Sequence, residues 1–348
     1  MTDFVKKLTN WSAHYDWLKI TTIDAHTAGE PLRIVTSGIP ELTGDTILAK
    51  RRYMKENYDH LRKQLMWEPR GHANMYGCIV TPPVTQEANF GVVFMHNEGY
   101  SSMCGHGIIA ITKVAIESGL LEMIEPQTII KIDSPAGLIT ATANIKNNKV
   151  GKISFQNVPS YTVNLDSKVE ISEYGKIKYD LAFGGAYYAY VQVADVGLSC
   201  YLKDIDQLIQ ISREIKKAVI NSVNIEHPIE NDLNFLYGII FIDKPKDSDS
   251  HSRNVCIFAN GEVDRSPTGT GVSGRLAIHY GRGDIGIGET ITIESLFGTK
   301  FECKVIKETK FGQHNAIIPE VTGEAFITGK HEFYIDPDDS LEGVIFTR

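Results

Sequence analysis

MCGHGIIA at residues 103–110 is a small, glycine-rich turn that runs straight into an apolar stretch. The same pattern returns at residues 267–278, where PTGTG opens the apolar stretch VSGRLAI. Helical spacing after a glycine-rich turn predicts a helix that begins at the turn. The sequence therefore predicts two equivalent helix starts, with the thiol of Cys104 on the first turn and the hydroxyl of Thr268 on the second.

A helix N-terminus presents unpaired backbone N–H groups and the positive end of the helix dipole. Each turn can therefore hold an anion, and we expect the first turn to lower the pKa of the Cys104 thiol. Two such helix ends that face one another would form a small anion-binding site with chemistry at its centre.

Other segments also occur in the same order in both halves of the chain. IKIDSPAG at residues 130–137 and ITIESLFG at residues 291–298 each follow one of the predicted helices. Both halves also carry one-sided apolar patterns of a further helix, through Ile47, Met54, Tyr58, Leu61 and Leu65 in the first and Leu208, Ile211, Ile215 and Ala218 in the second. The repetition predicts two related α/β lobes with the two turns facing one another across a cleft.

We place the boundary between the lobes near residues 160–178. The first lobe is expected to span residues 1–172 and to carry Cys104. The second is expected to span residues 173–327 and to carry Asp264 and Thr268, and residues 328–348 are expected to pack back on the first lobe.

The composition favours a protein that acts on small molecules. The chain has 348 residues, of which 42% are hydrophobic and 22% charged, and these fractions are ordinary for a soluble globular protein. The formal net charge of −8 argues against a nucleic-acid or anionic-membrane partner. Neither a signal peptide nor a long apolar run is found, so we expect a cytoplasmic protein without a membrane span.

The cysteines give no sign of disulfides or of a metal site. Their number is five, they are widely spaced, and none forms a C-x-x-C motif. We expect Cys78, Cys256 and Cys303, which are in strand-like runs, to be small buried residues, and Cys200 carries no functional signal. Cys104 differs because it lies at a predicted helix start, and there is no dinucleotide fingerprint that would imply a cofactor.

Several strings resemble the proline racemase family. They are MCGHG at residues 103–107, DRSPTGTG at 264–271, HTAGEP at 26–31, EPRGH at 68–72, and the glycine pair at 184–185 before an aromatic strand. The resemblance spans nearly the whole chain. It implies a fold similar to diaminopimelate epimerase, of α/β (α+β) class, with two pseudo-symmetric lobes that are each a curved, mostly antiparallel sheet around a central helix.

The resemblance also implies a reaction, and this chain departs from the family pattern at one position. Racemases of this family use a cysteine on each lobe to exchange the Cα proton of proline without a cofactor. Here the second cysteine is replaced by Thr268. In members that resemble this chain, with Cys in the first turn and Thr in the second, the activity is dehydration of trans-3-hydroxy-L-proline.

Elementary chemistry supports the same reaction. A thiolate at Cys104 can remove the Cα proton, whereas the hydroxyl of Thr268 ionises far above physiological pH. If the neighbouring carbon of the substrate carries a hydroxyl, the electrons left at Cα can expel it. The product would then tautomerise to the cyclic imine Δ1-pyrroline-2-carboxylate, and no cofactor is required.

Substrate-binding groups follow from the turns. The backbone N–H groups of Gly105, His106, Gly269 and Thr270 are predicted to hold the substrate carboxylate while negative charge develops on it. The resemblance implies that Asp264 binds the ring nitrogen, although this carboxylate could instead only cap the second turn.

The proton donor for the departing hydroxyl is left open. His26, His72, His106 and a water molecule are all candidates, and His26 and His72 are equally well explained as structural histidines. The hydroxyl of Thr268 either contacts the substrate, or the side chain simply fills the volume of a cysteine.

The rival functions are a proline racemase or 4-hydroxyproline 2-epimerase, and an inactive amino-acid-binding protein. A homodimer is expected because it is the commonest oligomer.

Overall fold

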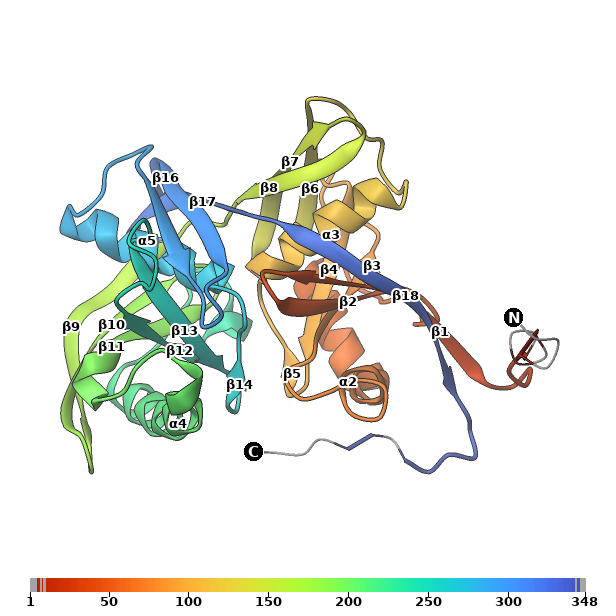
Figure 1. Cartoon of the computed structure of the whole chain (residues 1–348), viewed down its shortest axis with the longest axis horizontal. Helices are drawn as coiled ribbons and strands as arrows, with labels where there is room; N and C mark the ends of the chain where they lie inside the picture. The colour runs from red at the N-terminus through yellow and green to blue at the C-terminus, as the bar shows by residue number, and fades with distance from the viewer. Residues whose placement is uncertain (1–4, 7, 9–10, 342, 345–348) are drawn as a thin grey trace.

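The structure is a computed structural model that describes residues 5, 6, 8, 11–341, 343 and 344. Two lobes lie side by side (Figure 1). The first contains the helices α2 (Ile47–Met66) and α3 (Gly105–Glu117) and the strands β1 (Leu18–Thr27), β2 (Glu30–Ser37), β3 (Tyr76–Thr81), β4 (Phe90–His96), β5 (Gly99–Tyr100), β6 (Gln127–Ser134), β7 (Gly137–Lys146), β8 (Lys149–Gln156) and β18 (Ala325–Ile335). The second contains α4 (Ile205–Ser222), α5 (Gly269–Arg282), β9 (Tyr161–Ile171), β10 (Gly175–Phe183), β11 (Tyr187–Gln192), β12 (Leu236–Asp243), β13 (Ser252–Phe258), β14 (Glu262–Val263), β15 (Thr290–Glu294), β16 (Lys300–Phe311) and β17 (His314–Gly323), with short 3-10 helices at Val193–Val196, Leu202–Asp204 and Asn231–Leu233.

The strands form one continuous hydrogen-bonded ladder that repeats its own plan. Its order is β18-β1-β2-β3-β4-β6-β7-β8, then β17-β16-β15-β13-β12-β11-β10-β9, with β5 beside β4 and β14 beside β13. The parallel pairs are β2–β3 and β4–β6 in the first lobe and β11–β12 and β13–β15 in the second. β1 thus corresponds to β10, β2 to β11, and so on to β9 and β18. The prediction of two pseudo-symmetric, mostly antiparallel lobes is confirmed.

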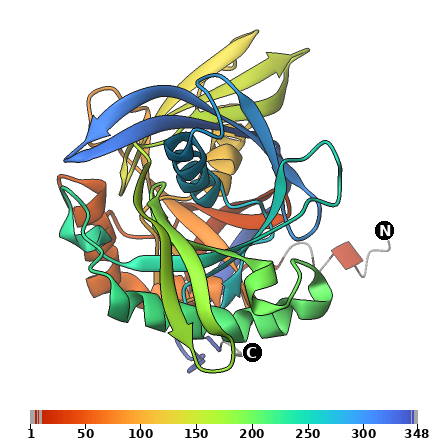
Figure 2. The ribbon, with the colours of Figure 1, turned by 90° about the vertical axis from the view of Figure 1, so that its left-hand side faces the viewer.

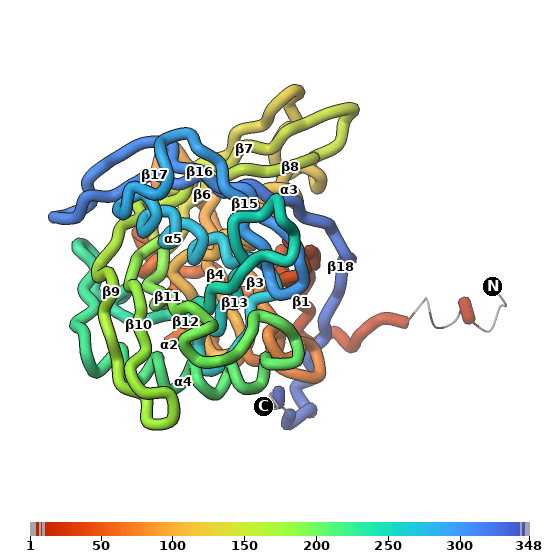
Figure 3. The backbone as a smooth tube through the Cα atoms, turned by 60° about the vertical axis from the view of Figure 1, so that its left-hand side comes forward, coloured from red at the N-terminus to blue at the C-terminus, as the bar shows by residue number. Residues whose placement is uncertain are grey.

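Each half of the chain places its last strand in the other lobe. β9 pairs with β10, and β18 runs back from the second lobe to pair with β1 (Figure 3). Residue 172, the expected end of the first lobe, therefore lies in the turn of the β9–β10 hairpin. The boundary between residues 172 and 173 stays a prediction.

The helices α3 and α5 occupy the centres of their lobes. Figure 2 looks at the second lobe end-on and shows α5 enclosed by strands. In α3, the side chains of Ile108, Ile109 and Ile116 are all buried, on more than one face of the helix. Burial of each such side chain contributes about 1.5–3 kcal/mol, which fixes the helix and the turn before it.

The outer helices α2 and α4 carry apolar residues on one side only. Thr46 caps α2 by accepting a hydrogen bond from Ala49 N–H at 3.0 Å. Ile47, Met54, Leu61 and Leu65 are buried as predicted, as are Leu208, Ile211 and Ile215 of α4. All five cysteines are buried and free, which confirms the prediction for Cys78, Cys256 and Cys303. Within the part of the chain that the structure describes, no helix is long and apolar enough to cross a membrane.

Candidate active site

The first turns of α3 and α5 touch one another between the lobes. A Cβ atom built on Gly105 would lie 2.7 Å from the Cα of Gly269, and one built on Gly269 would lie 2.8 Å from the Cα of Gly105. Side chains cannot approach a backbone so closely, and only glycine lets the two turns meet. The two helix starts singled out in the sequence are therefore brought into direct contact.

Both turns leave backbone donors free of their own helices. The first helical hydrogen bonds run from Ile108 N–H to Cys104 O at 2.9 Å and from Val272 N–H to Thr268 O at 2.7 Å. The N–H groups that precede Ile108 and Val272 in each turn have no acceptor within their helix. Together with the two helix dipoles, they make the junction a place for an anion such as a carboxylate.

Cys104 is the N-cap residue of α3. Its sulfur accepts a hydrogen bond from Gly107 N–H at 3.2 Å and lies 3.3 Å from Nδ1 of His106. The backbone at Cys104 is extended, with φ −143°. The thiol is buried at the point where the two turns meet.

The expected fall in the pKa of the thiol does not occur. Burial raises the pKa of Cys104 well above its ordinary value, and the negative charge of Asp264 raises it further, while the Gly107 N–H only partly opposes this. The sequence-based expectation considered the helix dipole without the desolvation that follows when the lobes close. In the closed, substrate-free site the thiol is therefore protonated at neutral pH.

Thr268 occupies the equivalent position before α5, with a different backbone. Its φ of 68° is in the left-handed region, which is unusual for a β-branched residue and indicates strain. Its N–H donates to the Ser266 hydroxyl at 3.1 Å. Its own hydroxyl is buried and has no hydrogen-bond partner among the described residues.

A small cavity lies between the turns. Its lining consists of Tyr76, Met103, Cys104, Gly105, His106, Tyr188, Tyr237, Phe258, Asp264, Thr268, Gly269 and Thr270. The volume of about 20 Å³ holds about one water molecule. A ring with a carboxylate needs more space than this, so the lobes are closed around the cavity in this structure.

Asp264 supplies a carboxylate to this cavity. It is buried, and its Oδ1 accepts a hydrogen bond from Ser266 N–H at 2.7 Å. The same side chain therefore holds the turn before α5 and presents negative charge to the cavity. The two alternatives weighed for Asp264 are compatible.

The family follows from comparison with known proteins. The family model for proline racemase matches residues 22–344. The chain belongs to the proline racemase family. It is 51% identical over 326 residues to a trans-3-hydroxy-L-proline dehydratase of Colwellia psychrerythraea, over 94% of this chain and 92% of that protein. It is 48% identical to a trans-3-hydroxy-L-proline dehydratase of Bacillus thuringiensis subsp. konkukian, over 92% of this chain and 96% of that protein.

A solved structure of a hydroxyproline epimerase has the same fold. The hydroxyproline epimerase of Agrobacterium vitis, determined with bound trans-4-hydroxy-L-proline, superposes with a TM-score of 0.88 at 27% identity, covering 93% of this chain and 95% of that one. This likeness confirms the predicted family and fold. Since relatives of one fold carry different names, the reaction has to be argued from the residues of the site.

The segment at residues 26–31, where β1 turns into β2, contacts both helix starts. Thr27 donates its hydroxyl hydrogen to His106 O at 2.8 Å, which holds the first turn of α3. Glu30 accepts hydrogen bonds from Arg265, from N–H at 2.7 Å and from the guanidinium at 3.4 Å. Burial raises the pKa of Glu30 well above its ordinary value, and the charge of Asp264 adds to this effect. This segment thus positions both turns, a role that the sequence analysis did not assign to Glu30.

His26 and His72 lie outside the cavity. Nδ1 of His26 accepts a hydrogen bond from Gly29 N–H at 3.3 Å, and its ring packs on Phe326. His72 is exposed, with Nδ1 2.8 Å from Ala73 O. The remaining predicted residues, Cys104, Gly105, His106, Asp264, Thr268, Gly269 and Thr270, all line the cavity.

The sequence analysis missed the aromatic wall of the site. Tyr76 is in β3, Tyr188 in β11, Tyr237 in β12 and Phe258 in β13. In the sequence these residues look like ordinary strand residues. Two signals could have found some of them, namely the position of Tyr76 shortly after the EPRGH string and that of Tyr188 in the aromatic strand after the glycine pair at 184–185. Within the described residues, no group of three or more His, Cys, Asp or Glu side chains is arranged to hold a metal ion.

Proposed function

We propose that this protein dehydrates trans-3-hydroxy-L-proline to Δ1-pyrroline-2-carboxylate, with Cys104 as the base that removes the Cα proton. The observation that carries the proposal is the pairing of one thiol with one hydroxyl at equivalent turns. Among the described residues that line the cavity, Cys104 is the one cysteine, and Thr268 lines the same cavity from the second lobe. The names of the two relatives at 51% and 48% identity support the same reaction.

The substrate carboxylate would bind at the junction of α3 and α5. Removal of the Cα proton places negative charge on this carboxylate, and N–H groups preorganised around it stabilise that charge. The N–H groups of Gly105, His106, Gly269 and Thr270 precede the first helical hydrogen bonds and are suited to this role. Asp264, in the same cavity, would pair with the positively charged ring nitrogen.

Binding of the substrate would also activate the thiol. Burial and then the charge of Asp264 hold the pKa of Cys104 high in the empty site. A positively charged ring nitrogen next to Asp264 offsets that charge and favours the thiolate. The base would therefore form when the substrate arrives.

The fate of the electrons at Cα depends on whether the second lobe carries a group that can return a proton to Cα. Thr268 is too weak an acid and base to return a proton to the opposite face of Cα at neutral pH. The electrons instead form a double bond to the neighbouring carbon and expel its hydroxyl. The enamine then tautomerises to the cyclic imine.

A direct experiment separates the rival functions. The purified protein is incubated in turn with trans-3-hydroxy-L-proline, trans-4-hydroxy-L-proline and L-proline, while imine formation and optical rotation are followed. We expect imine from the first substrate and little change in the other two. Racemisation of L-proline at a comparable rate would indicate a racemase, and no turnover of any of the three would indicate a binding protein.

Three further proposals concern cofactors, location and assembly. We propose that the reaction needs no cofactor, because the held carboxylate is a sufficient electron sink, and exhaustive dialysis against a chelator should leave the rate unchanged. We also propose a cytoplasmic location and a homodimer. Fractionation of the source cells and light scattering on the purified protein test these two points.

A further inference from the structure

The stereochemistry of the proposed substrate decides which wall of the cavity the hydroxyl faces. In trans-3-hydroxy-L-proline the carboxylate and the hydroxyl lie on opposite faces of the ring. The Cα hydrogen therefore lies on the same face as the hydroxyl. If Cys104 removes that hydrogen, the hydroxyl departs toward the first lobe, on the side away from Thr268.

Few groups of the first lobe can give the departing hydroxyl a proton. The first-lobe side chains in the cavity lining that carry an exchangeable proton are Tyr76, Cys104 and His106. Burial lowers the pKa of His106, so its ring is neutral at physiological pH, and a neutral imidazole is a much weaker acid than a phenol. Cys104 is engaged as the base at the moment when the C–O bond breaks.

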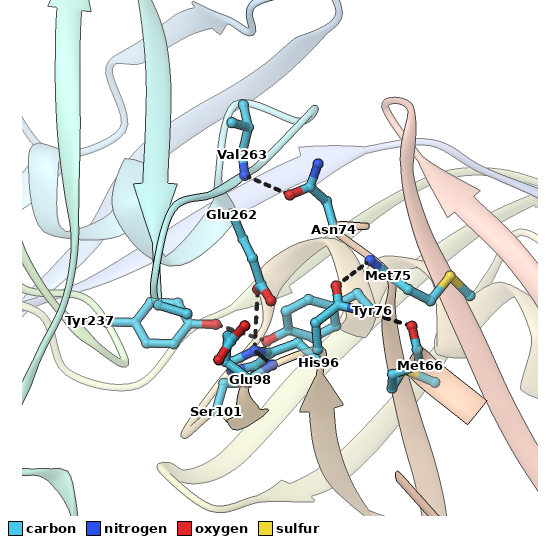
Figure 4. A network of polar contacts seen from close by, with 12 residues as sticks. Met66, Asn74, Met75, Tyr76, His96, Glu98, Ser101, Tyr237, Glu262 and Val263 are labelled. Carbon is cyan, nitrogen blue, oxygen red and sulfur yellow. Dashed lines mark hydrogen bonds and ion pairs between the residues drawn. The ribbon is translucent and has the colours of Figure 1, made fainter. Parts of the chain in front are cut away.

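Tyr76 lines the same cavity as the base, and other hydroxyls lie next to its own. Its side chain is buried and lines the cavity, and its ring packs edge-on against His106 with centroids 4.9 Å apart. Its hydroxyl is hydrogen-bonded to Ser101 and lies 3.4 Å from the hydroxyl of Tyr237. Figure 4 shows Tyr237 reaching from the second lobe toward Tyr76. These neighbours can donate hydrogen bonds to Tyr76 once it has lost its proton.

The hydroxyl of Tyr76 and the thiol of Cys104 also influence one another. Burial raises the pKa of Cys104, and the neighbouring Tyr76 hydroxyl acts in the opposite direction. Burial also raises the pKa of Tyr76 well above its ordinary value, and the nearby Cys104 adds to this. Tyr76 therefore keeps its proton across the physiological pH range until a strong base such as a departing hydroxide develops beside it.

Resting on the function proposed above, we propose that Tyr76 is the catalytic acid that protonates the departing hydroxyl. The Cα–H bond breaks and its proton passes to the Cys104 thiolate, while the carbon–oxygen bond breaks and the oxygen takes the Tyr76 proton and leaves as water. The proton on Cys104 then moves to the Tyr76 phenolate, because a phenolate is ordinarily the stronger base. Both groups are thereby reset without any further reactant.

Two substrates with different leaving groups test the assignment. Fluoride leaves without needing a proton, so trans-3-fluoro-L-proline bypasses the acid but still needs the base. In the Tyr76→Phe variant, kcat for trans-3-hydroxy-L-proline should fall about 100-fold or more, with KM changed only a few-fold. Fluoride release from trans-3-fluoro-L-proline should stay within about tenfold of the wild type, whereas Cys104→Ala should lose both reactions.

Two matched controls separate an acid from a structural residue. Tyr161 is also buried, and its hydroxyl is hydrogen-bonded to Tyr187 at 2.6 Å, but it lies outside the cavity. Tyr161→Phe should leave both reactions within a few-fold of the wild type, and thermal unfolding should show that the Tyr76→Phe variant is folded. If the wild type releases no fluoride, the acid-independent reaction is instead measured as Cα-hydrogen exchange of L-proline in deuterated water, because that reaction has no leaving group.

The outcomes discriminate between the assignments. Equal losses of both reactions in Tyr76→Phe would make Tyr76 a support for Cys104 and overturn the proposal. Unchanged dehydration would also overturn it, and would mean that Cys104 returns its own proton to the hydroxyl. If the wild type does not dehydrate trans-3-hydroxy-L-proline at all, the proposed function fails before the question of the acid arises.

Discussion

Gly105→Ala tests whether contact between the two helix starts is what makes the site. The added Cβ would lie 2.7 Å from the Cα of Gly269 and 3.0 Å from Cζ of Phe155, whereas ordinary contacts begin at 3.4 Å. The two turns would have to separate by about 0.7 Å, and overpacking of this kind costs about 1–3 kcal/mol. Displacing the substrate-holding N–H groups by a large fraction of an ångström should lower kcat/KM about 100-fold.

Gly281→Ala is the matched control for this variant. Gly281 also lies in a central helix, α5, and a Cβ there would meet the Thr162 hydroxyl at an unstrained 3.8 Å. Replacing an unstrained helical glycine by alanine should raise stability by up to about 1 kcal/mol and leave kcat/KM unchanged. Steady-state rates and thermal unfolding of both variants provide the measurement. Wild-type kcat/KM in a folded Gly105→Ala protein would refute the reasoning.

Three further predictions concern single side chains. Cys104→Ala should reduce dehydration by about 1,000-fold or more while the protein stays folded. Because the pKa of Cys104 is raised in the empty site, kcat/KM of the wild type should keep rising into the alkaline range. The bound substrate favours the thiolate, so kcat should level off at lower pH. Thr268→Cys should allow measurable racemisation of L-proline, followed by chiral chromatography in deuterated water, and its absence would show that a second thiol is not what the site lacks. The pKa of Glu30 is raised in the folded protein, so its stabilising contribution is present below its unfolded pKa of about 4.3 and is lost as pH rises through the folded pKa. Glu30→Gln should therefore unfold at the same temperature as the wild type at pH 4 and at a higher temperature than the wild type at pH 8. A variant that unfolds below the wild-type temperature at pH 8 would contradict this prediction.

The sequence was sufficient for the parts of the fold that repeat. The glycine-rich turns and the apolar stretches after them predicted α3 and α5, and Gly105 and Gly269 meet where two facing helix starts were expected. The one-sided patterns predicted α2 and α4 because each buries a single face. Local pattern and tertiary role agree in these elements.

The exchange of β9 and β18 between the lobes was not fully predictable. Strand pairing is decided by partners far away in the sequence, and neither strand carries a local mark of the lobe in which it ends. The aromatic wall has the same origin, since Tyr76 and Tyr237 come from separate strands of different lobes and meet only after folding. The direction of the Cys104 pKa shift was wrong because it depends on burial, which a helix start in the sequence does not reveal.

The two turns that match so well in sequence differ in backbone as well as in side chain. Cys104 is extended, with φ −143° and ψ 106°, whereas Thr268 is left-handed, with φ 68° and ψ 91°. The thiol and the hydroxyl are therefore carried by backbone of different conformation. Strain of about 1–3 kcal/mol at such a position persists only where the surroundings hold it. The symmetric scaffold therefore presents an asymmetric pair of groups, and an asymmetric pair suits a reaction that takes a proton from one face of Cα and returns none to the other.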